Sequence, residues 1–337
     1  MAPPWLHFIE RPFPSANMVL IAGPRPVLVD PGFGSDRAAT ADLLRGAGIP
    51  PERLALIVNT HYHSDHIGGN YALQHTYGLP VAAHAAEAAQ VNARDPQTGM
   101  AVWLDQPIEP YTVQQPLHDG DEVDTGAVRL RVVHTPGHTR GHITLYAPAE
   151  QILIAGDALH AADVPWINRF GEGADALEQA LATLDRLAAL PLRWACSGHG
   201  PAITDPAAAI AKTRRRYTQW QQAPEQLAWH ACKRIFAYAL MIRDGLPEAE
   251  VRPYLLNRSW FADYSRHVFG VEPAAFVERF LAEILRVGAG VWQDRRLVAR
   301  TPHIPPPPGW IAAPARPQDW PAVPSPALLD STNRKHL

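Results

Sequence analysis

The chain has 337 residues, of which 47% are hydrophobic and 19% charged, and its formal net charge is −3. These values describe a globular protein with a large core, most simply one main domain with an appendage, and they exclude a disordered chain or an obvious polyanion binder. No apolar run reaches the roughly 18 to 20 residues of a membrane span, and the N-terminus does not have the pattern of a signal peptide. Only two cysteines occur. For these reasons we expect a cytoplasmic protein.

Short β-strand patterns dominate the first half of the chain, and many of them end in glycine, proline or aspartate, which favour turns. Helical patterns lie between them, the clearest at 174–189, where apolar residues recur at i, i+3, i+4 and i+7. Strands interspersed with packed helices predict an α/β layered domain. The predicted strands are 6–10, 18–22, 26–30, 54–60, 80–84, 128–134, 142–147, 151–156 and 193–196, and the other helices are 36–47, 69–76 and 84–92.

The second half of the chain reads as helical. Residues 1–204 hold 12 Lys and Arg against 21 Asp and Glu, whereas residues 205–300 hold 15 against 10, which predicts a domain boundary near residue 204. Helices are predicted at 206–222, 224–244, 247–256 and 272–287, each with a proline near its start, and a hairpin is predicted at 290–300. We therefore expect a helical, winged-helix-like domain over 205–300.

Residues 301–337 form a Pro-rich tail that we expect to be extended. Its tryptophans, Trp310 and Trp320, predict that the tail packs on something, either its own domain or a partner.

The strongest chemical signal is the stretch NTHYHSDHIGG at residues 59–69, which follows an apolar strand. Imidazole and carboxylate are the usual protein ligands of zinc and similar divalent ions. His61 and His63 lie two positions apart on the loop, and Asp65 and His66 follow where a helix should begin. Four such side chains are too many for one ion that shares its shell with water, so the loop predicts two neighbouring ions.

Three later strands also end at a polar residue of the same kind. The strands at 128–134, 151–156 and 193–196 lead to His138, Asp157 and His199. Because strand ends on one rim of a sandwich can converge, we expect these three side chains to meet the loop.

Four motifs, THYHSDHIGG, TPGHTRGH, AGDAL and SGHG, resemble in this order the metal-binding motifs of the metallo-β-lactamase superfamily, most closely its glyoxalase II and lactonase branches. The resemblance covers residues 15–204. It implies a four-layer αβ/βα sandwich, here with a mainly helical C-terminal appendage.

The resemblance also implies the ligand set and the mechanism. Two divalent ions are expected, zinc first, with manganese and iron as alternatives, and a hydroxide between them would be the nucleophile. Asp65 would also orient that hydroxide or carry its proton, as a catalytic residue. The implied ligands are His61, His63 and His138 for one ion, Asp65, His66 and His199 for the other, and Asp157 for both.

Departures from the family's branches narrow the expected reaction. True β-lactamases of the superfamily usually lack an aspartate where this chain has Asp157. The nucleases of the superfamily have a long inserted domain before the final histidine, whereas only 41 residues separate Asp157 and His199 here. The redox-active di-iron relatives carry Glu where this chain has His63. Hydrolysis of an ester, thioester or lactone is therefore the central interpretation.

Other residues receive weaker roles. His142 in TPGHTRGH is expected to lie outside the metal shell with a structural or supporting role, and Cys196 is expected to be a buried thiol rather than a nucleophile. Segment 159–170 leaves the sheet directly after Asp157 and should run over the site. The expected substrate pocket contains Tyr62, His160, Trp166, Asn168, Arg169 and Phe170.

Two further functions stay open. A mononuclear iron dioxygenase of the persulfide type shares the motif set, and metal analysis would separate it from a dinuclear hydrolase. A hydrolase that acts on RNA is the other alternative, since winged-helix-like appendages occur on this fold in such enzymes. We expect a small-molecule substrate and no membrane partner, and we regard nucleic acid as an unlikely partner. The C-terminal region is expected to shape the pocket or a homodimer interface.

Overall fold

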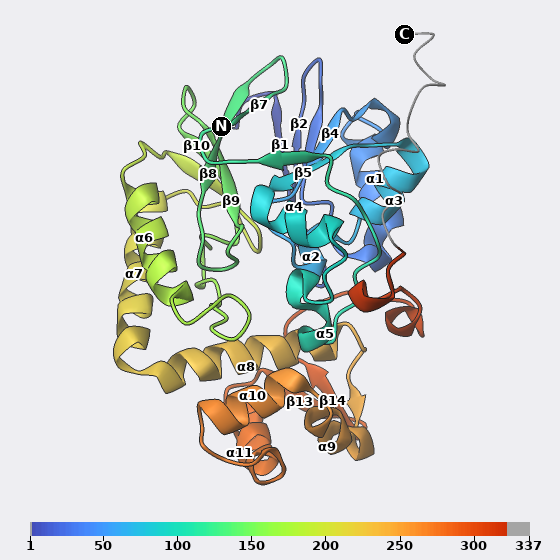
Figure 1. The fold of residues 1–337 in the computed structure, drawn as a ribbon, viewed down its shortest axis with the longest axis vertical. Helices are drawn as coiled ribbons and strands as arrows, with labels where there is room; N and C mark the ends of the chain where they lie inside the picture. The colour runs from blue at the N-terminus through green and yellow to red at the C-terminus, as the bar shows by residue number, and fades with distance from the viewer. Residues whose placement is uncertain (1, 322–337) are drawn as a thin grey trace.

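The computed structural model describes residues 2–321, and two β-sheets packed face to face form its centre (Figure 1). Residues of both sheets share one core, which includes Val29 and Val58 from the first sheet and Leu145 and Ile154 from the second. The first sheet follows chain order, with β1 (Leu6–Ile9), β2 (Met18–Ile21), β3 (Val27–Val29), β4 (Leu56–Val58), β5 (Val81–His84) and β6 (Gln115–Leu117). The second has the order β11 (Trp194–Ser197), β10 (Ile152–Gly156), β9 (Ile143–Ala147), β8 (Arg129–His134) and β7 (Glu122–Asp124).

Helices cover the outer face of each sheet (Figure 1). On the first sheet these are α1 (Arg37–Gly46), α3 (Asn70–Tyr77) and α4 (Ala85–Asn92), which share a core that includes Leu44, Leu73 and Val91. On the second sheet α6 (Ala176–Ala188) and α7 (Pro206–Gln222) pack through Leu184 and Tyr217. The four-layer sandwich expected from the motifs is therefore confirmed.

The C-terminal part is helical, as predicted. Helix α8 (Pro224–Met241) runs below the sandwich and packs on α9 (Glu248–Leu256), α10 (Ser259–His267) and α11 (Pro273–Arg286) (Figure 1). The predicted hairpin is present as β13 (Gly290–Gln293) and β14 (Arg296–Ala299), and β12 (Leu246–Pro247) pairs with β14. Helix α7 belongs to the outer layer of the sandwich, and the division of the chain near residue 204 stays a prediction.

The helical turn expected at Asp65 and His66 is present as α2 (Ser64–Ile67). The elements α5 (Ala101–Leu104), β6, β7 and β12 escaped prediction because they are too short to show a period. The nine-residue α10 was also not predicted. Within residues 2–321, no helix combines the length and the apolar character that crossing a membrane requires.

The described part of the tail packs on its own chain. The ring of Trp310 lies 5.1 Å from that of Phe33, and Trp320 Nε1 donates a hydrogen bond of 2.9 Å to the carbonyl oxygen of Ile108. Single turns of 3₁₀ helix at Trp310–Ala312 and Pro317–Asp319 interrupt the expected extended chain. The predicted extension over residues 322–337 lies outside the described residues.

Candidate metal centre

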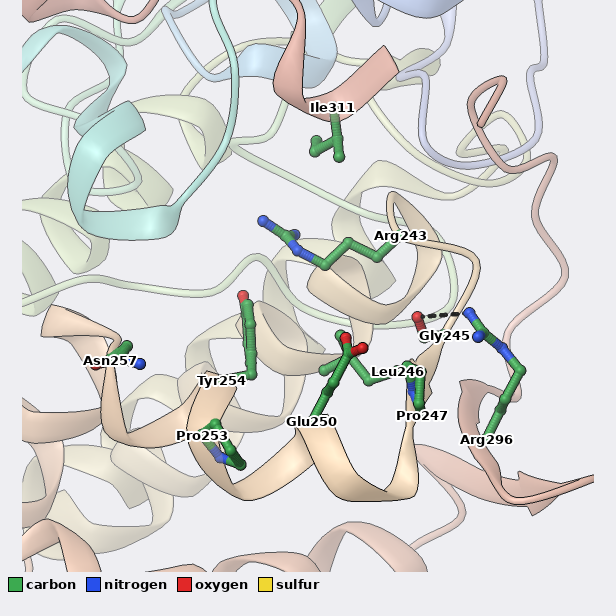
Figure 2. A pocket seen from close by; sticks show the side chains of 10 residues that line it. All are labelled: Arg243, Gly245, Leu246, Pro247, Glu250, Pro253, Tyr254, Asn257, Arg296 and Ile311. Atoms are coloured by element: carbon green, nitrogen blue, oxygen red, sulfur yellow. Dashed lines mark hydrogen bonds between the residues drawn. The ribbon is translucent and has the colours of Figure 1, made fainter. Parts of the chain in front are cut away.

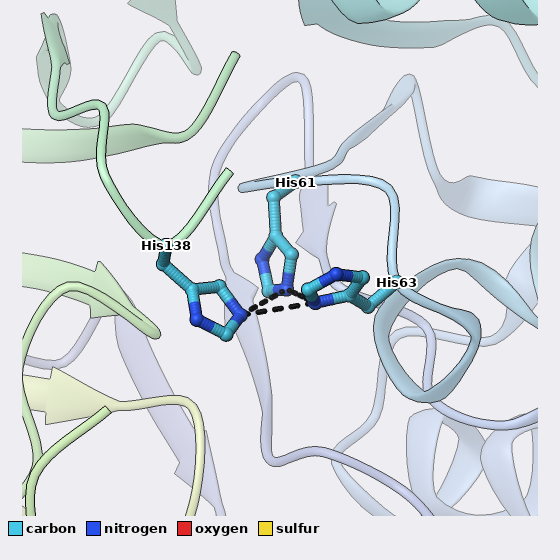
Figure 3. Close-up of side chains that lie close together, drawn as sticks. All are labelled: His61, His63 and His138. Atoms are coloured by element: carbon cyan, nitrogen blue, oxygen red, sulfur yellow. Dashed lines mark hydrogen bonds between the residues drawn. The ribbon is translucent and has the colours of Figure 1, made fainter. Parts of the chain in front are cut away.

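Three histidine nitrogens meet at one point on the rim between the two sheets (Figure 3). His61 Nε2 lies 3.0 Å from His63 Nδ1 and 3.2 Å from His138 Nε2. His63 Nδ1 lies 3.0 Å from His138 Nε2. Nitrogens bound to a tetrahedral ion at about 2.0–2.1 Å lie roughly 3.3 Å from one another, so the triangle has the size of a zinc ligand face.

These three imidazoles are poised as lone-pair donors. His138 Nδ1 lies 2.8 Å from the carbonyl oxygen of Trp166 and must donate to it, which leaves Nε2 of the neutral ring without a proton. Burial lowers the pKa of His63 to about 3 and that of His138 to about 4, and burial together with neighbouring histidines holds the pKa of His61 well below its ordinary value. All three rings are therefore neutral at pH 7, the form that binds metal.

A second group of ligand-type side chains adjoins the first. His199 Nε2 lies 3.1 Å from Asp65 Oδ2, and His66 Nε2 lies 3.5 Å from Asp157 Oδ1. The other oxygen of Asp157 lies 3.6 Å from both His138 and His199, so this carboxylate stands between the two groups. The structure thus brings together all seven residues that the sequence singled out.

Two atoms of the second group, His66 Nε2 and Asp157 Oδ1, are buried without a hydrogen-bond partner among the described residues. An unsatisfied buried polar atom is costly, and a bound cation between a lone-pair nitrogen and a carboxylate oxygen would satisfy both. The donor set, nitrogen-rich in one group and mixed with carboxylates in the other, therefore fits a pair of divalent ions.

The second group also attracts positive charge. Burial alone would raise the pKa of Asp157, but His199, His160 and His66 hold it well below its usual range. Burial alone would lower the pKa of His66, but Asp157, Asp30 and Asp65 raise it well above its ordinary value. A proton or a metal ion is needed here to compensate the buried carboxylates.

Asp30, at the end of β3, supports the site and was missed from the sequence. Its Oδ2 lies 2.8 Å from His66 Nδ1 and accepts a 2.6 Å bond from Thr60 Oγ1, while its Oδ1 accepts from the Thr60 amide. Such outer carboxylates fix which nitrogen of a ligand histidine faces the metal. The same signal that indicated Asp157, an apolar strand that ends in aspartate, was present at Asp30.

His142 supports Asp157 from behind. Its Nε2 accepts a 3.1 Å hydrogen bond from the Asp157 amide, and its Nδ1 lies 2.8 Å from Thr135 Oγ1. Both ring nitrogens are occupied, so the structure places His142 outside the ligand groups, as expected. Cys196 is buried, and burial raises the pKa of its thiol far above the ordinary value, which agrees with an inert side chain.

Two glycines let the strand ends approach one another. Gly156 has a φ of +49°, and a Cβ there would lie 2.7 Å from Thr60 Oγ1. At Gly198 a Cβ would lie only 2.1 Å from Asp157 Oδ1. Glycine at these positions is what allows β10 and β11 to deliver Asp157 and His199 to one point.

A cavity of about 460 Å³ opens onto the metal centre, and His63, Asp65, Asp157 and His199 line it. Of the expected pocket residues, His160 and Trp166 line it, and His160 Nε2 lies 3.2 Å from Asp157 Oδ1. Side chains of α8 line the opposite wall and were not predicted, although their spacing of three and four residues was a readable signal. They are His230, Lys233, Arg234, Ile235, Ala237, Tyr238 and Met241.

The other four expected pocket residues lie elsewhere, which corrects the prediction. Tyr62 is buried and donates a 3.1 Å hydrogen bond to Glu172, and Asn168 is buried with its amide on the sulfur of Met100. Arg169 and Phe170 line a separate cavity of about 210 Å³ beside α10. Loop side chains follow their own packing and hydrogen bonds, which the sequence does not reveal.

A cavity of about 540 Å³ beside α9 and β12 contains none of the metal-type residues (Figure 2). Arg243 and Tyr254 line it, and Ile311 of the tail borders it. In this cavity Arg296 donates to the carbonyl oxygen of Gly245 at 3.1 Å. Its lining carries no histidine or cysteine and only one carboxylate, Glu250. The cavity of about 460 Å³ is therefore the better candidate for the substrate site.

The family model of the metallo-β-lactamase superfamily matches residues 11–199, more than half of the chain. Together with the sandwich and the converging strand ends, this match shows that the chain belongs to the metallo-β-lactamase superfamily.

Similar proteins carry hydrolase and thioesterase names. A hydroxyacylglutathione hydrolase of Methylococcus capsulatus is 30% identical over 190 residues, which cover 55% of this chain and 62% of the relative. An acyl-coenzyme A thioesterase of Gallus gallus is 34% identical over 168 residues, covering 43% and 58%. The chain thus spans less than two thirds of the length of each of these two relatives.

One solved structure resembles nearly the whole chain. A metallo-β-lactamase family protein from Thermus thermophilus matches with a TM-score of 0.58 and 26% identity, covering 88% of this chain and 99% of that one. Because this match covers most of the chain, it extends beyond residues 11–199 into the C-terminal helices.

Proposed function

We propose that the protein is a dinuclear metal-dependent hydrolase that cleaves a thioester, with esters and lactones as the next substrates. The observation that carries the proposal is the pair of adjoining ligand groups that share Asp157. The names of the relatives support the thioester, because hydroxyacylglutathione and acyl-coenzyme A are both thioesters.

The ligand assignment follows the two groups. His61, His63 and His138 would hold one ion, Asp65, His66 and His199 the other, and Asp157 would contact both. Zinc suits the nitrogen-rich group, and manganese or iron is the alternative. When bound, two such ions supply a water nucleophile at neutral pH and an electrophile for the scissile carbonyl.

The chain's own residues supply positioning and proton transfer. Burial opposes ionisation of Asp65, yet His66 and His199 lower its pKa below the ordinary value, so its carboxylate is ionised and can accept a proton. Phe13 stacks on His199 with ring centroids 4.9 Å apart and, with Trp166, walls the cavity against water. The leaving group would depart toward the wall made by α8.

Metal content separates this proposal from its alternatives. One iron per chain with consumption of oxygen would favour the persulfide-type dioxygenase. Cleavage of single-stranded RNA without thioester hydrolysis would favour the RNA-acting hydrolase, which the expected winged-helix-like appendage and the excess of basic residues over 205–300 support.

Substitution of the ligands tests the proposal. His61→Ala and Asp157→Ala should each lower the metal content and abolish hydrolysis across a panel of thioesters, lactones, aryl esters and phosphoesters. His75→Ala, on the exposed side of α3, is the matched control and should leave both unchanged. Full activity in a metal-free Asp157→Ala variant would contradict the mechanism.

A further inference from the structure

Helix α8 presents one polar edge to the metal cavity. His230, Lys233 and Arg234 lie three and four residues apart and therefore share a face of the helix, and all three line the cavity. One turn further along, Tyr238 and Met241 continue the same wall with apolar surface. His230 accepts a hydrogen bond from Arg234 Nε on its Nε2, and burial lowers its pKa to about 3, so it is neutral. We call Lys233 and Arg234 the α8 cationic edge.

Arg234 is paired with a carboxylate that is easily displaced. It forms an ion pair with Asp163, which lies on the loop after Asp157 and also lines the cavity. The side chain of Asp163 is 58% exposed, whereas that of Arg234 is 31% exposed and is also held by a 3.1 Å hydrogen bond to His230. The Val164 amide donates a 2.8 Å hydrogen bond to Asp163 Oδ1, which holds this carboxylate on its loop. Because exposed ion pairs are weak, another anion can still compete with Asp163 for the guanidinium.

Lys233 shares its carboxylate partner with a second cation. Lys233 Nζ lies 3.4 Å from Glu283 Oε1, but Arg286 already donates to both oxygens of Glu283 at 2.7 and 2.9 Å. The wall can therefore accept another anion.

We propose that the α8 cationic edge binds an anionic group of the substrate, for which Asp163 is the internal stand-in. The inference rests on the proposed hydrolase function and deepens it, because it defines the substrate as an acyl thioester that carries a carboxylate or a phosphate. Arg234 is the main anchor, since guanidinium binds either anion in a two-pronged geometry. The apolar part of the substrate lies against Tyr238 and Met241.

Thioesters with one acyl group and different charges test this selectivity. Butanoyl thioesters of 3-mercaptopropionate (anionic), N-acetylcysteamine (neutral) and thiocholine (cationic) isolate the carboxylate, and butanoyl-coenzyme A against butanoyl-pantetheine isolates the phosphates. Wild-type enzyme should have the highest kcat/KM on an anionic member. Which anionic member shows the larger advantage decides between carboxylate and phosphate.

Two variants act in opposite directions. Arg234→Gln should reduce the anionic-to-neutral ratio of kcat/KM by about 10-fold, mainly through KM. Asp163→Asn should raise the same ratio, because it removes the competing anion. Arg252→Gln, on the exposed side of α9, is the control and should change nothing. A ratio that stays the same in Arg234→Gln, or that falls in Asp163→Asn, would overturn the proposal.

A binding experiment stands independently of hydrolysis. N-Butanoyl-β-alanine is the amide of the same shape as the anionic thioester, and N-propylbutanamide is its neutral counterpart. In calorimetric titrations, wild type should bind the first more tightly than the second, and Arg234→Gln should abolish the difference. If no thioester is hydrolysed, the proposed function fails, while equal binding of the two amides by wild type would reject the anion site by itself.

Discussion

Asp30 shows how a residue outside both ligand groups controls them. One of its oxygens faces His66 Nδ1 and Thr60 Oγ1, and the other accepts from the Thr60 amide, so the backbone beside His61 and the ring of His66 are tied to one carboxylate. The negative charge of Asp30 also strengthens His66 as an electron donor.

Replacing this carboxylate should weaken metal binding without unfolding the protein. We expect Asp30→Asn to lower the affinity of the group containing His66 by about 10–100-fold, the range typical for outer partners of metal ligands. Competition with a chromophoric chelator measures the affinity. Asp42→Asn, which alters an exposed pair with Arg45, should leave it unchanged, and equal losses in both variants would contradict the role of Asp30.

At the scale of elements, the site depends on how closely β10 and β11 approach. The amide of Gly198 donates to the carbonyl oxygen of Gly156 at 2.8 Å, which joins the two strand ends directly beside Asp157 and His199. This contact leaves no room for a side chain at residue 198.

Gly198→Ala should therefore disturb the metal centre selectively. The added Cβ would lie 2.1 Å from Asp157 Oδ1, so the carboxylate must move away from its position between the two groups. We expect loss of at least one bound ion and of most hydrolytic activity, with a retained fold by circular dichroism. Gly46→Ala, where a Cβ meets nothing within 4 Å, is the control. Normal metal content in Gly198→Ala would show that Asp157 is not positioned this way.

Some residues of the site could be predicted from the sequence, and others could not. The seven metal-type residues were found because each follows a strand with a clear apolar pattern, and strand ends on one rim of a sandwich can converge. Asn168 and Phe170 were misplaced because their loop is shaped by contacts with Met100 and Tyr264, which are distant in sequence. Helix α8 was predicted as a helix, but only the fold shows that its face with Arg234 closes the cavity.

At the scale of the whole molecule, the two ligand groups should differ in their response to pH. In the metal-free protein His66 has a raised pKa and holds a proton near neutral pH, and metal must displace that proton. The pKa values of His63 and His138, about 3 and about 4, leave these two ligands of the first group free of added protons at neutral pH.

Zinc affinity of the second group should accordingly rise with pH around neutrality, by up to about 10-fold per pH unit for each displaced proton, while that of the first group stays constant. Chelator competition at pH 6, 7 and 8 measures both affinities. The same slope for both groups would contradict the assignment of charge in the site.

Metal stoichiometry measured together with activity tests the central claim most directly. Protein stripped of metal is titrated with zinc while bound metal and hydrolysis of a butanoyl thioester are recorded on the same samples. We predict that hydrolysis is absent without metal and reaches its maximum only when two ions are bound per chain. Full hydrolysis in the metal-free protein, or a maximum at one ion per chain, would contradict the dinuclear hydrolase.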